Sequence, residues 1–184
     1  MNLDRLIIRD ATIVDIPEVA KLHVDSWNIT YNGIIAQDHL DKMRNNIDKR
    51  IKRMEDEFNL RKMIVATIDD EIVAFSEYTL TNKFSKDLDI DCELCGLYVK
   101  NQYVGIGIGT KMFNYVVNEF LQNDKSKMGL WCIKENTNAI NFYKSKGGIK
   151  VAEKKFELAG KEYNEIAFVY DLTVDESWVS IIKE

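Results

Sequence analysis

Hydrophobic and polar positions follow two different periods along this chain, and together they predict a mixture of strands and helices. The apolar run over residues 6–9 predicts a first strand. Thr12 and Asp15 then have the spacing of a capping box, and Pro17 falls in the first turn of the helix that would follow. Apolar residues at helical spacing continue as far as Trp27, so we expect one helix to run to that point.

The next part of the chain predicts more helix and then a β-hairpin. Residues 37–60 are rich in charge and have the pattern of one or two helices, with a break near Asn45 and Asn46. Residues 63–68 and 72–80 are two β-rich runs, and the short acidic segment between them predicts a turn.

The second half continues to alternate strand and helix patterns. We expect, in order, a polar loop over 81–90, a strand over 94–99, a glycine loop, a helix through 112–120, a strand over 130–133, a helix over 136–147, two hairpin strands over 151–158 and 163–172, and a short helix over 176–182. No linker, repeat or low-complexity tract divides the chain, so we predict one α/β domain.

Three glycines at alternate positions mark the junction between a predicted strand and a predicted helix. Gly105, Gly107 and Gly109 follow the strand over 94–99 and precede the amphipathic stripe over 112–120. Glycines at such a junction let the backbone turn tightly and leave amide N–H groups uncovered at a helix N-terminus. These amides and the helix dipole attract an anion such as a pyrophosphate, so we expect a phosphorylated cofactor.

Spacing separates three classes of phosphate-binding loop. A P-loop ends in Gly-Lys-Ser/Thr, whereas this loop is too short and ends in Gly109-Thr110-Lys111. A dinucleotide fingerprint has Gly-x-Gly-x-x-Gly directly after the strand and an acidic residue about 20 positions later. Here the loop is longer, the pattern is Gly-x-Gly-x-Gly, and Glu135 lies too far along. The segment instead resembles the acetyl-CoA-binding loop of the GNAT superfamily of N-acetyltransferases.

A second motif lies downstream, in the order that this superfamily requires. After an apolar strand, the chain resembles the family's helix pattern Asn-x-x-Ala-x-x-Phe-Tyr-x-x-x-Gly. The matching residues are Asn136, Ala139, Phe142, Tyr143 and Gly147. The resemblance covers roughly residues 6–172 and implies a GNAT-like acyl-CoA N-acyltransferase fold in a single domain over residues 1–184. That fold is α/β, with a mixed, mostly antiparallel sheet of six or seven strands, splayed between the fourth and fifth and flanked by helices.

The resemblance also implies where acetyl-CoA, the acetyl donor, contacts the chain. Backbone groups of Leu97, Tyr98 and Val99 pair with the pantetheine arm like an added strand. The pyrophosphate lies against a loop and helix start formed by Val104, Gly105, Ile106, Gly107, Ile108, Gly109 and Thr110. Asn136 and Tyr143 contribute from the second motif, although Asn136 equally suits a simple helix N-cap.

Two positions depart from the family pattern. Val104 stands where Arg or Gln is usual before the first glycine, and Gln102 takes that place only if the register slides by two residues. Because contacts at this loop are mainly backbone amides, we expect Val104 to weaken the site without removing it. Gly148 replaces the aromatic residue that usually follows Gly147, so we expect a less rigidly packed helix end.

Acetyl transfer from a thioester needs a neutral amine, a stabilised oxyanion and a proton for the leaving thiolate. The resemblance assigns Tyr143 as the donor of that proton, and simple packing of the ring is the alternative. Glu93 on the fourth strand is the candidate general base, with an exposed strand residue as the alternative. Trp27 and Tyr31 lie in the helical region that walls the acceptor site in the family, but aromatic residues at this spacing also suit a core.

These residues predict an enzyme that transfers acetyl from acetyl-CoA directly to a primary amine, on a small molecule, a peptide or a protein. A catalytically weak CoA-binding sensor or interaction module on the same fold is the alternative. The identity of the acceptor stays open, because the acceptor groove varies freely on this scaffold. Whether the chain forms a homodimer also stays open.

Composition narrows the partners further. The net charge of −5 argues against nucleic acid, because duplex binding uses a concentrated basic face. No apolar run approaches the roughly 20 residues of a membrane span. The N-terminus lacks the features of a signal peptide, so we expect a cytoplasmic protein with no membrane partner. Cys92 and Cys95 lie in a strand pattern that points them to opposite faces, and no second pair is near, so we expect no metal site.

Overall fold

The computed structural model describes residues 3–83 and 85–173. Its helices and strands are β1 (Leu6–Asp10), α1 (Ile16–Thr30), α2 (Gln37–Asn45), α3 (Ile47–Asp56), β2 (Lys62–Ile68), β3 (Glu71–Thr79), β4 (Cys92–Val99), α4 (Ile108–Gln122), β5 (Lys127–Ile133), α5 (Thr137–Ser145), β6 (Ile149–Leu158) and β7 (Lys161–Asp171). Short 3₁₀ helices add η1 (Leu3–Arg5), η2 (Ile13–Asp15), η3 (Phe58–Leu60) and η4 (Asn101–Tyr103). The helix expected over 176–182 lies outside the described residues.

The strands form one seven-stranded sheet in the order β1-β2-β3-β4-β5-β7-β6. The pairs β1–β2, β2–β3, β5–β7 and β6–β7 are antiparallel, whereas β4 and β5 are parallel. The parallel ladder is short, with Cys92 opposite Met128 and Glu93 opposite Gly129. The mixed, mostly antiparallel sheet flanked by helices confirms the predicted fold class.

Two strands begin earlier than their hydrophobic runs indicate. β4 begins at Cys92, because the first two residues pair with β5. β5 begins at Lys127 and pairs with β7 along its whole length, from Lys127 opposite Asp171 to Ile133 opposite Glu165. Glu93, Lys127 and Gly129 interrupt the hydrophobic pattern at these starts, so pairing extends the strands beyond what their pattern predicts.

The chain forms two compact units. The first contains the described residues up to Tyr78 together with Gly96–Tyr115. The second contains Thr79–Cys95 and the described residues from Val116 onward. The single domain over residues 1–184 stays a prediction.

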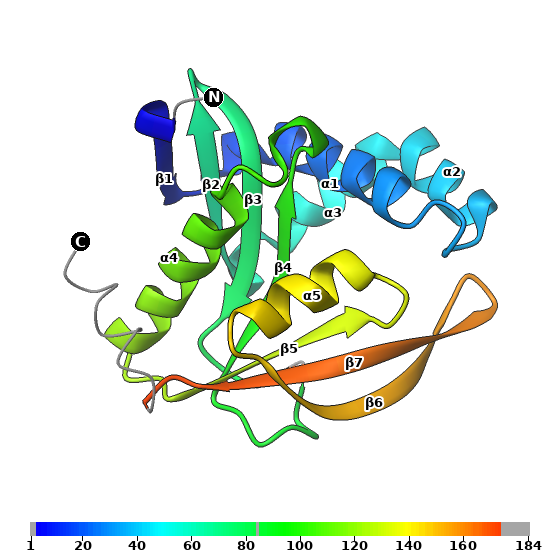
Figure 1. Cartoon of the computed structure of the whole chain (residues 1–184). Coiled ribbons are helices and arrows are strands. Elements are labelled where there is room, and N and C mark those ends of the chain that lie inside the picture. Colours follow the sequence, from blue (N-terminus) through cyan, green and yellow to red (C-terminus); the bar gives the residue numbers. More distant parts are fainter. Residues whose placement is uncertain (1–2, 84, 174–184) are drawn as a thin grey trace. The chain divides into compact units, whose positions relative to one another are not determined.

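In the first unit, helices α1 and α3 cover β2 and β3, as Figure 1 shows. The core between these four elements consists of Ile16, Val19, Ala20, Leu22, Met54, Met63, Val65, Ile72 and Phe75, all buried. The predicted capping box is present at the start of η2, which leads directly into α1, with Asp15 accepting from the Thr12 backbone N–H at 2.7 Å. Arg9 on β1 donates two hydrogen bonds of 2.8 Å to the same carboxylate, and these bonds link the helix start to the sheet.

In the second unit, α5 packs on β7, and Figure 1 shows it lying along β5 and β7. The rings of Tyr143 on α5 and Phe168 on β7 are 6.3 Å apart between centroids. A second small core joins Leu88 and Ile90, from the segment before β4, to Ala167 and Val169 of β7. The segment over 81–90 was predicted as a polar loop, but its apolar residues anchor it to the sheet.

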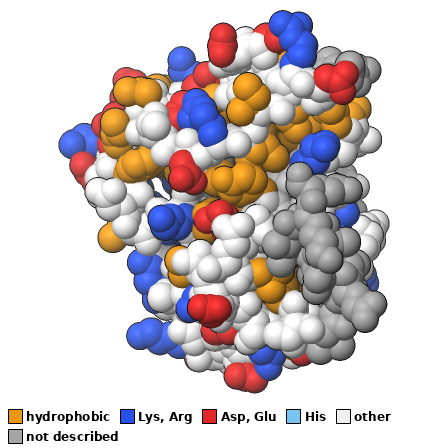
Figure 2. All heavy atoms as spheres, turned by 90° about the vertical axis from the view of Figure 1, so that its left-hand side faces the viewer, with side chains coloured by type: hydrophobic (Ala, Val, Ile, Leu, Met, Phe, Trp, Pro, Cys, Tyr) orange, Lys and Arg blue, Asp and Glu red, His pale blue; other side chains and the backbone are white. Residues whose placement is uncertain are grey.

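Acidic and basic side chains intermingle on the surface. Figure 2 shows blue and red side chains interspersed, with hydrophobic ones between them. Exposed hydrophobic residues include Ile7 on the edge strand β1, at 61% exposure. Charges of both signs share the face that Figure 2 shows.

Candidate active site

The glycine loop of the first unit has the backbone conformation that its sequence predicts. Gly105 and Gly107 have φ angles of 84° and 97°, in the left-handed region that side chains disfavour. Helix α4 then starts at Ile108, and its first-turn bond runs from the Lys111 N–H to the Gly107 carbonyl at 3.1 Å. By helix geometry, the amides of the first turn have no acceptor within the helix, so this terminus suits an anion. Val104 is 62% exposed beside it.

Polar contacts hold this loop to the rest of the first unit. Lys100, directly after β4, pairs with Glu18 of α1 at 3.2 Å and with Glu71 of β3 at 2.9 Å. The Tyr103 hydroxyl donates to the same Glu71 at 3.1 Å. The loop is thus anchored at its N-terminal end on both a helix and a strand before its glycines begin.

An aromatic wall forms around Tyr98, which itself lies in the strand segment predicted to bind pantetheine. The wall consists of Phe75, Tyr98, Trp27 and Tyr31. The Tyr98 ring stacks on Phe75 of β3 at 4.9 Å between centroids. The Trp27 indole N–H donates to the Tyr98 hydroxyl at 3.3 Å, and the rings of Trp27 and Tyr31 are 4.7 Å apart. Tyr31 is buried, whereas Trp27 is half-buried. The two predicted acceptor residues therefore lie together, and Trp27 is the one with surface left for a ligand.

His23 and Arg50 form a pair that the sequence analysis missed. The Arg50 Nη2 atom lies 3.3 Å from Nε2 of His23, and the His23 ring packs on Tyr98 at 4.9 Å. Burial first, and the Arg50 charge second, lower the pKa of His23 to about 3. The imidazole is therefore neutral, with Nε2 accepting from Arg50 and the proton on Nδ1. The two residues lie 27 positions apart on separate helices, so no spacing pattern connects them.

In the second unit, Glu93 is a buried carboxylate in a fixed orientation. Its side chain is 5% exposed, which excludes the alternative of an exposed strand residue. The Ser85 hydroxyl donates to Glu93 Oε1 at 2.7 Å, and the Trp131 indole N–H donates to the Ser85 oxygen at 3.1 Å. The Lys154 ammonium lies 3.8 Å from the centre of the Trp131 ring. Ser85 was missed because it lies in a segment whose sequence predicts only a loop.

The second motif forms α5 as predicted, and Asn136 is its N-cap. The Asn136 side-chain oxygen accepts from the Ala139 N–H at 3.1 Å, which confirms the capping role. Tyr143 is 9% exposed, and its ring meets Phe142 edge-on at 5.4 Å between centroids. The contact between Tyr143 and CoA stays a prediction.

The expectation of loose packing at Gly148 is wrong. The hydroxyl end of the Tyr170 side chain on β7 lies against Gly148, where a side chain would begin, and that hydroxyl donates to the Tyr143 carbonyl at 3.0 Å. A Cβ atom on Gly148 would lie 2.7 Å from the Tyr170 hydroxyl oxygen. The absence of a side chain at Gly148 therefore leaves room for Tyr170. The hydrogen bond from Tyr170 links the C-terminal end of α5 to β7.

The cysteines have the character of buried thiols. Cys92 and Cys132 are 0% and 6% exposed, and Cys95 is half-buried. Burial raises the pKa of the Cys92 thiol, and burial, with a smaller contribution from Glu165, raises that of Cys132 to about 12. Both stay protonated at neutral pH, and a protonated thiol is a poor nucleophile.

Within residues 3–83 and 85–173, no three His, Cys, Asp or Glu side chains group in a way that would hold a metal ion. No helix in the same ranges has both the length and the apolar character needed to cross a membrane.

Comparison with known proteins agrees with this geometry. A model of the acetyltransferase (GNAT) family matches residues 19–147. The uncharacterised N-acetyltransferase YuaI of Bacillus subtilis (strain 168) is 30% identical over 161 residues, which cover 86% of this chain and 89% of YuaI.

Solved structures share the fold at low sequence identity. A GCN5-related N-acetyltransferase ("Aminotransferase, Class-II") from Rhodopseudomonas palustris has a TM-score of 0.72 and 14% identity, covering 93% of this chain and 98% of that one. The putative acetyltransferase yncA from Salmonella typhimurium, solved with its cofactor acetyl-CoA, has a TM-score of 0.66 and 16% identity, covering 94% and 96%. The chain therefore belongs to the acetyltransferase (GNAT) family and is an acetyl-CoA-dependent N-acetyltransferase.

Proposed function

We propose that this enzyme transfers the acetyl group directly to a primary amine, with Glu93 as general base and Tyr143 as general acid. The observation that carries this proposal is the buried Glu93 carboxylate, which Ser85 orients through a 2.7 Å hydrogen bond. An acceptor amine is an ammonium ion at neutral pH and must lose a proton before it can attack. A carboxylate held in a fixed orientation on β4 supplies a place for that proton.

The acceptor nitrogen loses two protons during acetyl transfer. The ammonium loses a proton to Glu93, directly or through one water, and the neutral nitrogen attacks the thioester carbonyl. The C–S bond breaks, and the CoA thiolate takes the phenol proton of Tyr143. The second proton lost by the nitrogen restores the phenol, and Glu93 returns its own to solvent. The products are the amide, CoA and one proton.

The cysteines support direct transfer over a covalent acetyl-enzyme. Thioester exchange onto the protein requires a thiolate, and the raised pKa values of Cys92 and Cys132 keep both thiols protonated. Burial also denies both sulfurs access to a bulky thioester. Neither of these two sulfurs suits a covalent acetyl-enzyme, which favours attack of the amine on acetyl-CoA itself.

Two measurements test this function. Calorimetry with acetyl-CoA reports binding, and release of the CoA thiol across a panel of primary amines reports turnover. We expect micromolar binding, turnover with at least one amine, and no acetylated protein by intact mass after incubation with acetyl-CoA alone. Tight binding without turnover on a broad panel would instead support the sensor, and a stoichiometric acetyl adduct on a cysteine would disprove direct transfer.

A further inference from the structure

A small pocket of about 50 Å³ opens in the first unit beside α3. Its lining comes from α3, the segment around η3, and the ends of β2 and β3 that lie nearest to it: Arg50, Arg53, Met54, Glu57, Phe58, Arg61, Met63 and Glu77. No residue of the glycine loop or of the second motif lines it, so the cofactor prediction does not account for it.

The charges around this pocket do not balance. Arg53 pairs with Glu57 at 2.9 Å, and Arg61 pairs with Glu77 at 3.3 Å. These two pairs use both carboxylates of the lining. Arg50 forms no ion pair with any carboxylate of the described residues, and Glu57 and Glu77 act on it only from farther away. The pocket therefore carries one uncompensated positive charge.

Arg50 is also only partly satisfied in its hydrogen bonding. The guanidinium is half-buried, and its Nε atom is enclosed without a hydrogen-bond partner among the described residues. Its contact at Nη2 is the neutral imidazole of His23, which offers no negative charge. Burial lowers the pKa of Arg50, which reflects the cost of holding the cation there. A charged donor left in this state is stabilised by an anionic acceptor.

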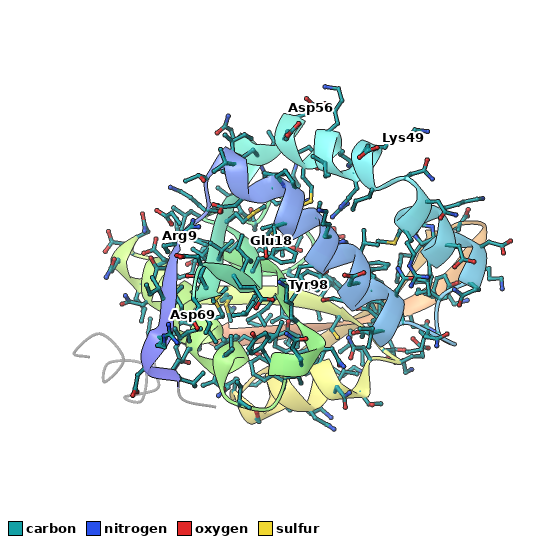
Figure 3. The ribbon with its side chains drawn as sticks, turned by 90° about the horizontal axis from the view of Figure 1, so that it is seen from above. Arg9, Glu18, Lys49, Asp56, Asp69 and Tyr98 are labelled. Atoms are coloured by element: carbon teal, nitrogen blue, oxygen red, sulfur yellow. The ribbon has the colours of Figure 1, made fainter. Side chains whose placement is uncertain are left out.

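Side-chain contacts link Arg50 to the aromatic wall through His23. From Arg50 the contacts run to His23, then to the ring of Tyr98, and from its hydroxyl to Trp27. In Figure 3, Tyr98 lies beneath α1, while Lys49 and Asp56 mark the outer side of α3. Arg50 is the next residue after Lys49, one position around the helix, and lines the pocket. Tyr98 is also close enough to act on the Arg50 charge directly.

Strand β4 joins the aromatic wall to the segment that we expect to hold the acetyl donor, because Tyr98 belongs to both. The Ser76 hydroxyl of β3 donates to the Gly96 carbonyl of β4 at 2.8 Å, and Glu77 follows Ser76 directly. The contacts of Arg50 lead through His23 to Tyr98, in the segment Leu97–Val99 that we expect to bind pantetheine. An acceptor must bring its amine to the thioester at the end of that arm.

We propose that Arg50 binds a carboxylate of the acceptor, so that the natural substrate is a small amino-carboxylate. The guanidinium fork matches a carboxylate in plane and spacing. The single excess positive charge suits a monoanion, whereas a phosphate dianion would face Glu57 and Glu77 with its second charge uncompensated. The identity of this ligand as the acceptor rests on the proposed function, but binding of the carboxylate does not.

Matched pairs of acceptors test the proposal kinetically. Each pair is an amino acid and the amine that lacks only its carboxylate, such as L-phenylalanine with 2-phenylethylamine and L-lysine with cadaverine. We expect the wild-type kcat/KM to favour the amino acid by about tenfold or more in at least one pair. Arg50→Gln should lower kcat/KM for that amino acid by about 10- to 100-fold and change the value for its partner amine by less than about twofold.

A matched control and a conservative variant separate this role from loss of folding. Lys49→Gln removes the same charge from the adjacent residue on the outer face of α3. It should leave kcat/KM unchanged for both the amino acid and its partner amine. Arg50→Lys keeps the charge without the fork and should recover part of the loss. Equal rates for both members of every pair in the wild type would overturn the proposal, as would equal effects of Arg50→Gln on both members.

Calorimetry of the amino acids with the wild-type protein in the presence of CoA gives a readout that does not need turnover. Binding of an amino acid but not of its partner amine, lost in Arg50→Gln and kept in Lys49→Gln, supports the carboxylate site even if no amine is acetylated. In that event the proposed function fails alone. Turnover of amines without any preference for the carboxylate would leave the proposed function intact and end this inference.

Discussion

Replacing Asp15 by asparagine removes the charge that ties the start of α1 to β1. Asp15 is 8% exposed and accepts two hydrogen bonds of 2.8 Å from Arg9 and bonds from the Thr12 N–H and hydroxyl. An asparagine oxygen can still accept from the Thr12 N–H. Its NH₂ group, however, would replace the oxygen that accepts from Arg9 Nη2, so that hydrogen bond is lost, and the remaining contact with Arg9 loses its negative charge.

The magnitude follows from the pKa of this carboxyl. The Arg9 hydrogen bonds, helped by those from Thr12 and opposed by burial, lower the pKa of Asp15 from 3.8 to about 2. A lowering of this size corresponds to roughly 2–3 kcal/mol at neutral pH. The Arg9 side chain is 42% exposed, so solvent screening reduces this figure, and we expect about 1.5–2 kcal/mol.

The sign of the pH dependence is fixed by the direction of the shift. A depressed pKa contributes stability that is complete above the unfolded value near 4 and is lost as pH falls toward 2. Urea unfolding followed by circular dichroism, at pH 7, 5, 4 and 3, measures this directly. The free energy of unfolding of Asp15→Asn should lie about 1.5–2 kcal/mol below wild type at pH 7 and 5, and the gap should narrow at pH 4 and again at pH 3.

Asp25 provides the control, because it lies exposed on the same helix. Asp25→Asn should change the free energy of unfolding by less than about 0.5 kcal/mol at every pH. A gap for Asp15→Asn that is as wide at pH 3 as at pH 7 would show that the loss is not electrostatic. A gap no larger than that of the control would show that the Arg9 contact contributes nothing.

Three further substitutions test the candidate site. Tyr143→Phe should lower kcat about tenfold or more while thermal stability and acetyl-CoA affinity stay near wild type, and a large stability loss with full turnover per folded molecule would assign the ring to packing alone. Ser85→Ala should lower kcat/KM about tenfold, because it removes a hydrogen bond to the Glu93 carboxylate, and unchanged kinetics would argue against Glu93 as the base. Gly148→Ala should reduce the free energy of unfolding by about 1–3 kcal/mol, because its Cβ would lie 2.7 Å from the Tyr170 hydroxyl oxygen, and an unaltered urea midpoint would show that the tyrosine moves freely.

Local features of the site could be predicted from sequence because short-range rules decide them. Gly105 and Gly107 take the left-handed conformation that permits the turn into α4. Asn136 caps α5 through a residue three positions away. Both depend on neighbours in the chain, and both motifs were recognised by their resemblance to the GNAT family pattern.

The environment of Glu93 could not be predicted in the same way. Alternation along a strand assigns a side chain to a face, but burial of that face depends on what packs against it. Ser85 comes from a loop eight residues earlier, and Trp131 lies on another strand. No pattern of hydrophobicity encodes a contact of this kind.

The sequence by itself determined the order of the described strands and helices and the glycine loop, because hydrophobic period, capping and backbone freedom act over a few residues. The two motifs indicated the family through their resemblance to its pattern. Only the tertiary structure decided which polar groups meet. Arg50 contacts His23, and Tyr170 takes the place left by Gly148, across separations that no local period spans. Such contacts arise when the apolar faces of separate elements pack and leave defined spaces between them, so side-chain volume and charge in three dimensions decide what fills each space.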